Sequence, residues 1–297
     1  VMDTSTLVGV RDPHGFRPLC LGSLDDSWVI ASETAALDIL GATFVRQVAP
    51  GEMVVITDDG PRSVFPFEEA ESQLCLFEFV YFARPDSTLL GQTVQKTRQR
   101  MGRLLAQQAS VDADITVPVP ESGIPAAQGF AEVTGLPYTD GLVKNRYVGR
   151  TFIQPAQAMR ERGVRMKLNA MPGVIEGKRV VLVDDSIVRG STTQQLVALV
   201  REAGATEVHL RISSPPYRWP CFYGMDTGDR STLLAAGRSV DEIAEHLGVD
   251  SLVYLDLANL IEATGAEPDS FCTACLSGSY PTDVPLTDGK FLLEQTP

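Results

Sequence analysis

Two adjacent carboxylates follow a run of aliphatic residues in the stretch RVVLVDDSIVRGSTTQQLVALVREAG, residues 179–204. The uninterrupted apolar run is typical of a strand that is buried on both faces of a parallel sheet. The strand ends at Asp184 and Asp185, and open α/β sheets bind their ligands at the carboxyl ends of the strands. The turn that follows contains Gly190 and leads into a predicted helix, whose first N–H groups can bind an anion.

The ligand that this pattern predicts carries both an anion and hydroxyl groups. Carboxylates repel an anion, so Asp184 and Asp185 suit sugar hydroxyls or Mg²⁺ better than a phosphate. The turn adds the hydroxyls of Ser191 and Thr192 at the start of the helix, where a phosphate can bind. A phosphorylated ribose has both features. Two carboxylates at a strand end could by themselves be only a strand cap followed by an ordinary helix start. The carboxylates together with the glycine and hydroxyls of the turn are a far more specific signal for a ligand site.

Two further segments have the residue types of an anion site. The loop of VPVPESGIPAAQGFAE contains Glu121, Ser122 and Gly123, and by itself indicates only a helix start. Residues 144–167 hold seven basic side chains and one acid in a chain whose formal net charge is −13. A solvated basic face is one explanation, and the other is a loop that closes over a polyanion, excludes water and stabilises a charged leaving group. The basic residues are Lys144, Arg146, Arg150, Arg160, Arg162, Arg165 and Lys167.

Five cysteines are spread over the chain, and this odd number fits reduced thiols or metal ligands better than a secreted disulfide framework. Cys272 and Cys275 have a Cys-x-x-Cys spacing that suggests zinc or redox chemistry. Cys75 and Cys221 could complete a four-thiolate site, but their distance along the chain does not show that they meet. Cys20 is predicted to be a small buried apolar residue.

The elements that position these residues change in type near residue 70. Before it, short alternating strands and one short helix predict a β-rich segment. After it, strands alternate with helices, which predicts a mainly parallel sheet with crossover helices. We expect helices over 34–40, 93–108, 125–134, 192–203 and 240–247, and parallel strands over 115–119, 180–183, 208–212 and 252–255.

Composition excludes several classes of protein. With 297 residues and 44% hydrophobic residues, the chain can form one large or two ordinary domains with a real core. The acidic balance argues against a general nucleic-acid binder. Since no apolar run approaches the roughly 18–20 residues of a membrane span and no signal peptide is evident, we expect a cytoplasmic protein. His14, His209 and His246 have no triad context and are assigned to surface or packing roles.

The stretch VVLVDDSIVRG resembles the phosphoribosylpyrophosphate (PRPP) loop of the type I phosphoribosyltransferases. This loop has Arg189 before the glycine, where a Thr is the other variant. The variant with Arg resembles the loop of the glutamine PRPP amidotransferases. Further stretches support this resemblance over nearly the whole chain: FVYFARPDS at 79–87, GLVKNRYVGRTFIQP at 141–155 and CTACLSGSYPT at 272–282. RGSTT departs slightly from the family, which more often ends this loop in Thr, Thr, Ser; hydroxyls remain, so little functional change is expected.

The resemblance implies an α/β protein with a type I phosphoribosyltransferase fold, in which helices flank a mainly parallel sheet. A β-rich C-terminal remnant of an N-terminal-nucleophile glutaminase domain would precede it. The implied domains are residues 1–70 for the partial glutaminase domain, 71–266 for the phosphoribosyltransferase domain and 267–297 for a C-terminal segment with cluster cysteines.

Site residues and cofactors follow from the same resemblance. Pyrophosphate would bind the loop at 121–123, and Lys144, Arg146 and Tyr147 would act in catalysis from the closing loop. The implied ligands of Mg²⁺ are Ser122, Asp184 and Asp185, and those of a [4Fe–4S] cluster are Cys75, Cys221, Cys272 and Cys275. The implied PRPP-binding residues are Glu121, Ser122, Gly123, Asp184, Asp185, Ser186, Arg189, Gly190, Ser191 and Thr192.

The implied reaction is that of an amidophosphoribosyltransferase, the first committed step of purine biosynthesis. PRPP and glutamine-derived ammonia give 5-phosphoribosylamine, pyrophosphate and glutamate. Members of the family begin with a nucleophilic cysteine, whereas residue 1 here is valine. We therefore expect the glutaminase nucleophile upstream or on a partner, and no glutaminase activity from this chain alone.

The resemblance also implies a homo-oligomer and feedback inhibition by purine nucleotides. Two alternatives stay open. One is a regulatory module that senses PRPP without turnover, and the other is a nucleobase phosphoribosyltransferase, for which the Arg189 loop and the cysteine set give no support.

Overall fold

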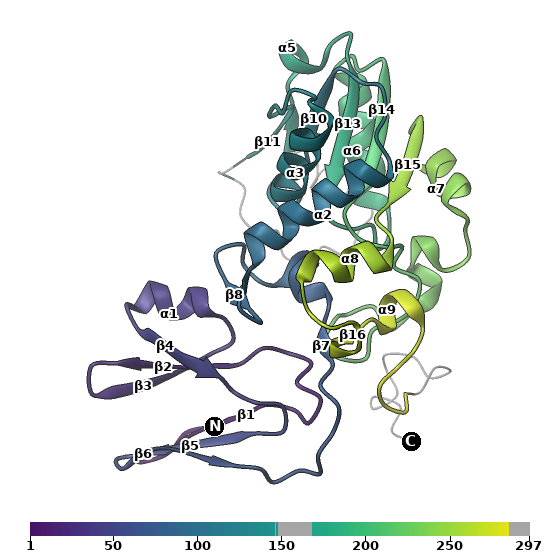
Figure 1. Ribbon diagram of the computed structural model, residues 1–297. Helices are drawn as coiled ribbons and strands as arrows, with labels where there is room; N and C mark the ends of the chain where they lie inside the picture. The colour runs from purple at the N-terminus through teal and green to yellow at the C-terminus, as the bar shows by residue number, and fades with distance from the viewer. Residues whose placement is uncertain (146, 148–167, 285–297) are drawn as a thin grey trace. The chain divides into compact units, whose positions relative to one another are not determined.

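The computed structural model describes residues 1–145, 147 and 168–284, which divide into two compact units (Figure 1). Unit 1 comprises Val1–Thr97, Thr264–Thr273 and Ser279–Asp283, and unit 2 is built mainly from Arg98–Ala263 and Ala274–Gly278. The domain limits expected at 70/71 and 266/267 are based on resemblance to known domains, whereas the two units are based on contacts within the structure. The expected limits therefore stay a prediction.

Unit 1 contains two antiparallel sheets of three strands, as the β-rich pattern before residue 70 predicts. One has the order β1-β5-β6 and the other β3-β2-β4. Leu21, Val48 and Val54 pack together in its core, and Cys20 is buried beside Leu37, as expected for a small apolar residue. The elements are β1 (Leu7–Val10), β2 (Cys20–Leu24), β3 (Ser27–Ala31), α1 (Thr34–Leu40), β4 (Thr43–Gln47), β5 (Met53–Thr57) and β6 (Gly60–Val64).

Short elements complete unit 1. The two-residue strands β7 (Leu74–Cys75) and β16 (Phe271–Cys272) pair in parallel, although nearly 200 residues separate them. A π-helix covers Glu78–Phe82, and a small hairpin joins β8 (Thr88–Leu89) to β9 (Gln92–Thr93). A 3₁₀ turn at Pro268–Ser270 leads into β16.

A four-stranded, fully parallel sheet of order β10-β13-β14-β15 forms the centre of unit 2. Its strands and helices lie within a residue or two of the predicted ranges, so the α/β interpretation is confirmed. The strands are β10 (Ile115–Pro118), β13 (Arg179–Asp184), β14 (Glu207–Ile212) and β15 (Ser251–Tyr254). The predicted helices are α2 (Val94–Gln108), α3 (Ile124–Thr134), α6 (Ser191–Glu202) and α7 (Val240–Leu247).

Several elements have no counterpart in the predicted set. Helix α8 covers Leu257–Thr264, and the strands β11 (Leu142–Lys144) and β12 (Leu168–Ala170) form an antiparallel pair. The short helices α5 (Pro172–Ile175) and α9 (Ala274–Ser277) and two 3₁₀ turns, Arg230–Thr232 and Leu234–Ala236, complete the described part. None of the helices in the described ranges is long and apolar enough to cross a membrane.

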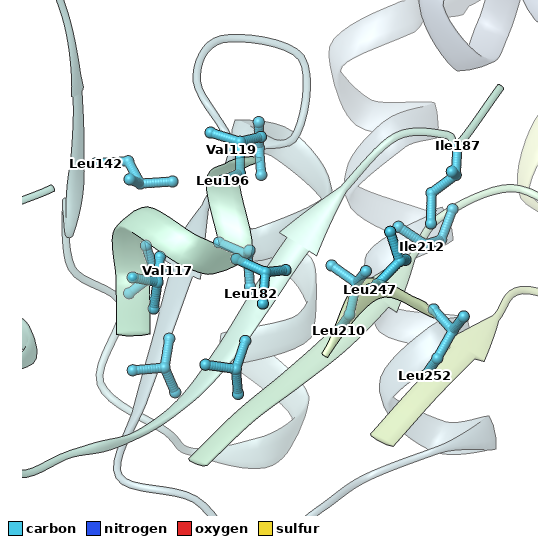
Figure 2. Close-up of a cluster of buried hydrophobic side chains, with 14 of the residues drawn as sticks. Val117, Val119, Leu142, Leu182, Ile187, Leu196, Leu210, Ile212, Leu247 and Leu252 are labelled. Carbon is cyan, nitrogen blue, oxygen red and sulfur yellow. The ribbon is translucent and has the colours of Figure 1, made fainter. Parts of the chain in front are cut away.

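Both faces of β13 are buried, as the apolar run predicts. Leu182 on one face joins a cluster with Leu196 of α6, Leu210 of β14 and Leu247 of α7 (Figure 2). Val181 and Val183 alternate with Leu182 along the strand, so they point to the opposite face, and they are equally buried. Helix α3 packs against β10 and β13. The strand is therefore fixed from both sides up to its carboxyl end.

An ion pair between a buried carboxylate and a partly exposed arginine spans the turn between β4 and β5 in unit 1. Glu52 is 1% exposed and accepts two hydrogen bonds from the Arg46 guanidinium, at 2.8 and 2.7 Å. The Ser63 hydroxyl and the Ala49 N–H also donate to this carboxylate. These partners, Arg46 above all, outweigh burial and lower the pKa of Glu52 to about 2.

This pKa predicts how stability depends on pH. A lowered carboxyl pKa stabilises the fold fully above the unfolded value of about 4.3, and the contribution is lost as pH falls toward 2. Glu52→Gln should cost about 1–2 kcal/mol at pH 7, since Arg46 is partly exposed, and the difference from wild type should shrink below pH 5. Urea unfolding from pH 7 to pH 3 measures it, with the exposed Glu68→Gln as control. A difference that is constant with pH would contradict the prediction.

Candidate functional site

The two predicted carboxylates lie at the carboxyl end of the central strand β13. Asp184 is the last residue of the strand, and Asp185 follows it; they are 8% and 6% exposed. The Asp185 N–H donates to Asp184 Oδ1 at 2.9 Å. The Ser213 N–H donates to the Asp184 carbonyl at 3.0 Å, which ties the end of β13 to the residue that follows β14.

These carboxylates differ in how well their charges are stabilised. Burial, and then the charge of Asp185, raise the pKa of Asp184 well above its ordinary value. Burial also raises the pKa of Asp185, but the hydroxyls of Ser122 and Ser186 and the charge of Arg98 oppose this effect. Two neighbouring buried carboxylates with a hydroxyl beside them are the oxygen ligands that a hard cation prefers. The donor set therefore fits Mg²⁺.

Arg98 was missed in the sequence, although a signal for it exists. The buried face of α2 runs through Val94, Met101 and Leu105 at helical spacing, and Arg98 lies on this face at 5% exposure. A buried arginine on an apolar face requires a charged or polar partner. Asp185 is one such partner, because the charge of Arg98 opposes the rise that burial causes in the pKa of this carboxyl.

The predicted loop at 121–123 is pressed against the end of β13. The Val119 N–H donates to the Val183 carbonyl at 2.8 Å, and the Gly123 N–H donates back to the Val119 carbonyl at 2.9 Å. A Cβ atom at Gly123 would overlap the main-chain oxygen of Val183, so only glycine allows this close approach. The loop thereby brings Ser122 to Asp185.

Only part of the predicted closing loop is described. Lys144 ends β11, and its Nζ lies 3.4 Å from Glu121 Oε2 in a partly exposed ion pair. Tyr147 is exposed, and its N–H donates to Asn145 Oδ1 at 3.0 Å. Arg146 lies outside the described residues, as do the further basic residues Arg150, Arg160, Arg162, Arg165 and Lys167.

The turn after β13 leaves the N-terminus of α6 open. Gly190 adopts φ +78° at the N-cap position, and no side chain caps the helix. A Cβ at Gly190 would lie 2.6 Å from Leu234 Cδ2, and the Leu234 N–H holds the turn through the Val188 carbonyl at 2.9 Å. Ser191 and Thr192 are exposed in the first helical turn. Uncapped N–H groups, hydroxyls and the helix dipole together form an anion-binding arrangement.

Arg189, in the turn between β13 and α6, contacts the segment 226–229. It is exposed, and its Nη2 donates to the Asp226 carbonyl at 3.4 Å. Its charge also contributes to the lowered pKa of Asp229, whose main cause is the hydrogen bonding of Ser231. The guanidinium therefore links the turn to residues 226–229.

Two of the four predicted cluster cysteines lie in each unit. Cys75 and Cys272 are partners in the β7–β16 ladder, and burial raises the pKa of the Cys75 thiol to about 12. In unit 2, the Cys275 carbonyl accepts the N–H groups of Arg218 and Trp219, each at 3.0 Å, two or three residues before Cys221. None of the five cysteines is part of a disulfide bond in the described structure.

The described ranges contain no group of three or more His, Cys, Asp or Glu side chains placed to hold a metal ion. A four-cysteine cluster site therefore stays a prediction. The donor chemistry fits such a cluster, because all four cysteines are thiols rather than disulfides, and Cys272 and Cys275 are only three residues apart. Among the histidines, the buried His209 ring forms hydrogen bonds with the side chains of Ser251 and Glu207. The His14 ring forms a hydrogen bond with the Glu71 carbonyl.

The comparisons with known proteins agree with this geometry. Residues 94–213 match the phosphoribosyl transferase domain family. This segment runs from the start of α2 to the end of β14 and contains both predicted loops and the carboxylates. Together with the parallel sheet, it defines unit 2 as a type I phosphoribosyltransferase fold.

The relatives are more specific. The chain is 54% identical to the amidophosphoribosyltransferase of Synechococcus elongatus over 294 residues, 97% of this chain and 60% of the relative. It is 50% identical to that of Bacillus subtilis over 288 residues, 96% of this chain and 60% of the relative. The chain belongs to the amidophosphoribosyltransferase family and spans about 60% of the length of these relatives.

Solved structures give the same result. The glutamine PRPP amidotransferase from B. subtilis, complexed with ADP and GMP, superposes with a TM-score of 0.89 at 49% identity, covering 97% of this chain and 64% of that one. A second structure, described as the allosteric regulatory enzyme of purine biosynthesis, has a TM-score of 0.89 at 50% identity, covering 96% and 62%. The match extends over the β-rich segment of unit 1, whose assignment to a partial glutaminase domain stays a prediction.

The close approach at Gly123 leads to a prediction. Gly123→Ala should destabilise the chain by about 1–3 kcal/mol, because the added methyl group must displace the main chain at the end of β13. Gly173→Ala is the matched control: it has open space around it, so it should be neutral or stabilising by up to about 1 kcal/mol. Urea unfolding midpoints measure both. Equal midpoints for the two variants would contradict the proposed packing.

Proposed function

We propose that this chain carries the PRPP site of an amidophosphoribosyltransferase and converts PRPP and ammonia into 5-phosphoribosylamine and pyrophosphate. The observation that carries the proposal is the pair of buried carboxylates, Asp184 and Asp185, directly before the uncapped N-terminus of α6. The names of the relatives at 50–54% identity support the same activity.

Each part of PRPP has a partner of suitable chemistry. The 5-phosphate binds the turn 186–192 through main-chain N–H groups and the hydroxyls of Ser191 and Thr192. The ribose hydroxyls donate to Asp184 and Asp185. The pyrophosphate binds the loop 121–123, where Lys144 already lies beside Glu121 and can turn to the incoming anion.

The proposed reaction is a displacement at the anomeric carbon. The bond from this carbon to the pyrophosphate oxygen breaks, and pyrophosphate leaves with the electron pair. The ammonia lone pair forms the new C–N bond, after which the nitrogen loses a proton. Positive charge develops on the ribose ring as the bond breaks, and the buried carboxylates stabilise it at short range.

Mg²⁺ and the basic loop complete the proposed site. Ser122, Asp184 and Asp185 would hold Mg²⁺, which supplies positive charge to the departing pyrophosphate. We propose Lys144, Arg146 and Tyr147 as the catalytic residues of a loop that closes on this anion. Basic side chains stabilise the charge that pyrophosphate gains, and closure excludes water.

Further parts of the proposal concern the complete enzyme. Glutamine would supply ammonia through the glutaminase part of the protein, in a homo-oligomer. Inhibition by purine nucleotides is supported by the B. subtilis relative, whose structure is a complex with ADP and GMP. A cytoplasmic location would keep the five cysteines reduced, in agreement with their thiol form in the described structure.

The transferase step is tested with the full chain, Mg²⁺, PRPP and an excess of an ammonium salt. We expect pyrophosphate release that depends on ammonium and is reduced at least about 100-fold in D184N/D185N, because the amides cannot stabilise the developing charge. Calorimetry with PRPP measures binding. The matched control is D58N/D59N, an exposed adjacent pair in a turn, which should behave as wild type.

The outcomes separate the alternatives. Unchanged PRPP affinity in D184N/D185N would remove the ribose assignment. PRPP binding by the wild type without pyrophosphate release would favour a sensing module. Release that requires a nucleobase in place of ammonium would favour a nucleobase phosphoribosyltransferase.

We also propose a [4Fe–4S] cluster held by Cys75, Cys221, Cys272 and Cys275. The pairing of Cys75 with Cys272 and the contact of Cys275 with residues 218–219 support it. The first brings the main chains of two cysteines together in unit 1, and the second brings the main chain of Cys275 close to the segment that precedes Cys221 in unit 2. The cluster would stabilise the fold, since the sugar chemistry transfers no electrons.

Anaerobic purification tests the cluster. We expect about four iron and four sulfide per chain with a brown chromophore, and a lower content after exposure to air. Cys20→Ser is the control, because Cys20 is buried elsewhere in unit 1 and should not affect iron content. Stoichiometric zinc without iron in both preparations would contradict the proposal.

A further inference from the structure

Thr227 lies at the centre of a small buried network around one of the cluster cysteines. It is 4% exposed, and its Oγ1 accepts the Cys221 N–H at 3.2 Å. The same oxygen shares a 2.6 Å hydrogen bond with the hydroxyl of Tyr217, which is fully buried. One threonine hydroxyl therefore joins an aromatic anchor in the core to the main chain of Cys221.

The network closes the loop that begins at Cys221. Thr227 follows six residues later, and its own N–H donates to the Met225 carbonyl at 2.9 Å. Gly224, near the tip, has φ +118°, a conformation open to glycine, and nothing lies within 4 Å of the place of its Cβ. Glycine gives such a loop conformational freedom, which the hydrogen bond from the Cys221 N–H to Thr227 limits at the first residue of the loop.

The sulfur of Cys221 is itself oriented by this loop. The Tyr223 N–H donates to Cys221 Sγ at 3.4 Å, from within the segment that Thr227 closes. N–H groups that point at a ligand sulfur stabilise its charged form and tune the metal group that it binds. Before Cys221 in the sequence, the N–H groups of residues 218 and 219 donate to the Cys275 carbonyl. The main chain is therefore held by hydrogen bonds on both sides of Cys221.

We infer that Thr227 is a positioning residue for metal-cluster ligation, fixing Cys221 through its hydroxyl. The inference rests on the proposed [4Fe–4S] cluster and adds a residue outside the four cysteines. In the described structure, the Thr227 hydroxyl forms its hydrogen bonds with the Tyr217 hydroxyl and the Cys221 N–H, and both belong to this network.

Two substitutions separate the hydroxyl from the packing. Thr227→Val keeps the shape but removes the oxygen, whereas Thr227→Ser keeps the oxygen. Thr116→Val is the matched control, because Thr116 is equally buried in unit 2 and its hydroxyl has no hydrogen-bond partner in the described structure. If the valine variant does not fold, Thr227→Ala removes the same hydroxyl with a smaller side chain.

The measurement is the iron and sulfide content after anaerobic purification and the rate at which the visible absorbance bleaches in air. We expect Thr227→Val to bleach about tenfold faster than wild type, as is usual when a group that orients a metal ligand is lost. Thr227→Ser and Thr116→Val should match wild type. Equal rates for Thr227→Val and wild type would overturn the inference, as would equal acceleration by serine and valine. A wild type without iron would instead overturn the cluster itself.

Discussion

The burial of two adjacent carboxylates at the end of an apolar strand is the constraint on which the rest of unit 2 depends. Desolvating a charged group is costly unless hydrogen bonds or opposite charges compensate. Here the compensation comes from Ser122, Ser186 and Arg98, each from a different segment of the chain. The loop at 121–123 and helix α2 must therefore lie close to β13, and the site is assembled by the same contacts that offset this cost.

Glycine makes these close contacts sterically possible. Gly123 lets its loop touch the main chain of β13, and Gly102 of α2 and Gly129 of α3 let these helices cross with their main chains in contact. A Cβ at either helical position would overlap a main-chain oxygen of the other helix. This crossing fixes α2, and with it Arg98, relative to α3, which begins directly after the loop that carries Ser122.

Much of this architecture could be predicted from local pattern. The apolar run before Asp184 and Asp185 gave the parallel strand, and the helices with strong periodicity were located within one or two residues. Helix α8 was missed because its apolar residues follow those of β15 after only Leu255 and Asp256, although Asp256 offered a helix-start signal. The pairs β7–β16 and β11–β12 could not be predicted, because each joins very short strands that are distant in the sequence.

The sequence by itself determined the chemistry available at each position: the carboxylates after β13, the glycine and hydroxyls of the turn, and the four cysteines with their family spacing. These features depend on residue type and short-range order, which a linear pattern contains. Only the tertiary structure placed Arg98 near Asp185, Cys75 beside Cys272, and Thr227 between Tyr217 and Cys221. Such contacts depend on which surfaces pack together, and packing is decided by the whole core rather than by any one segment.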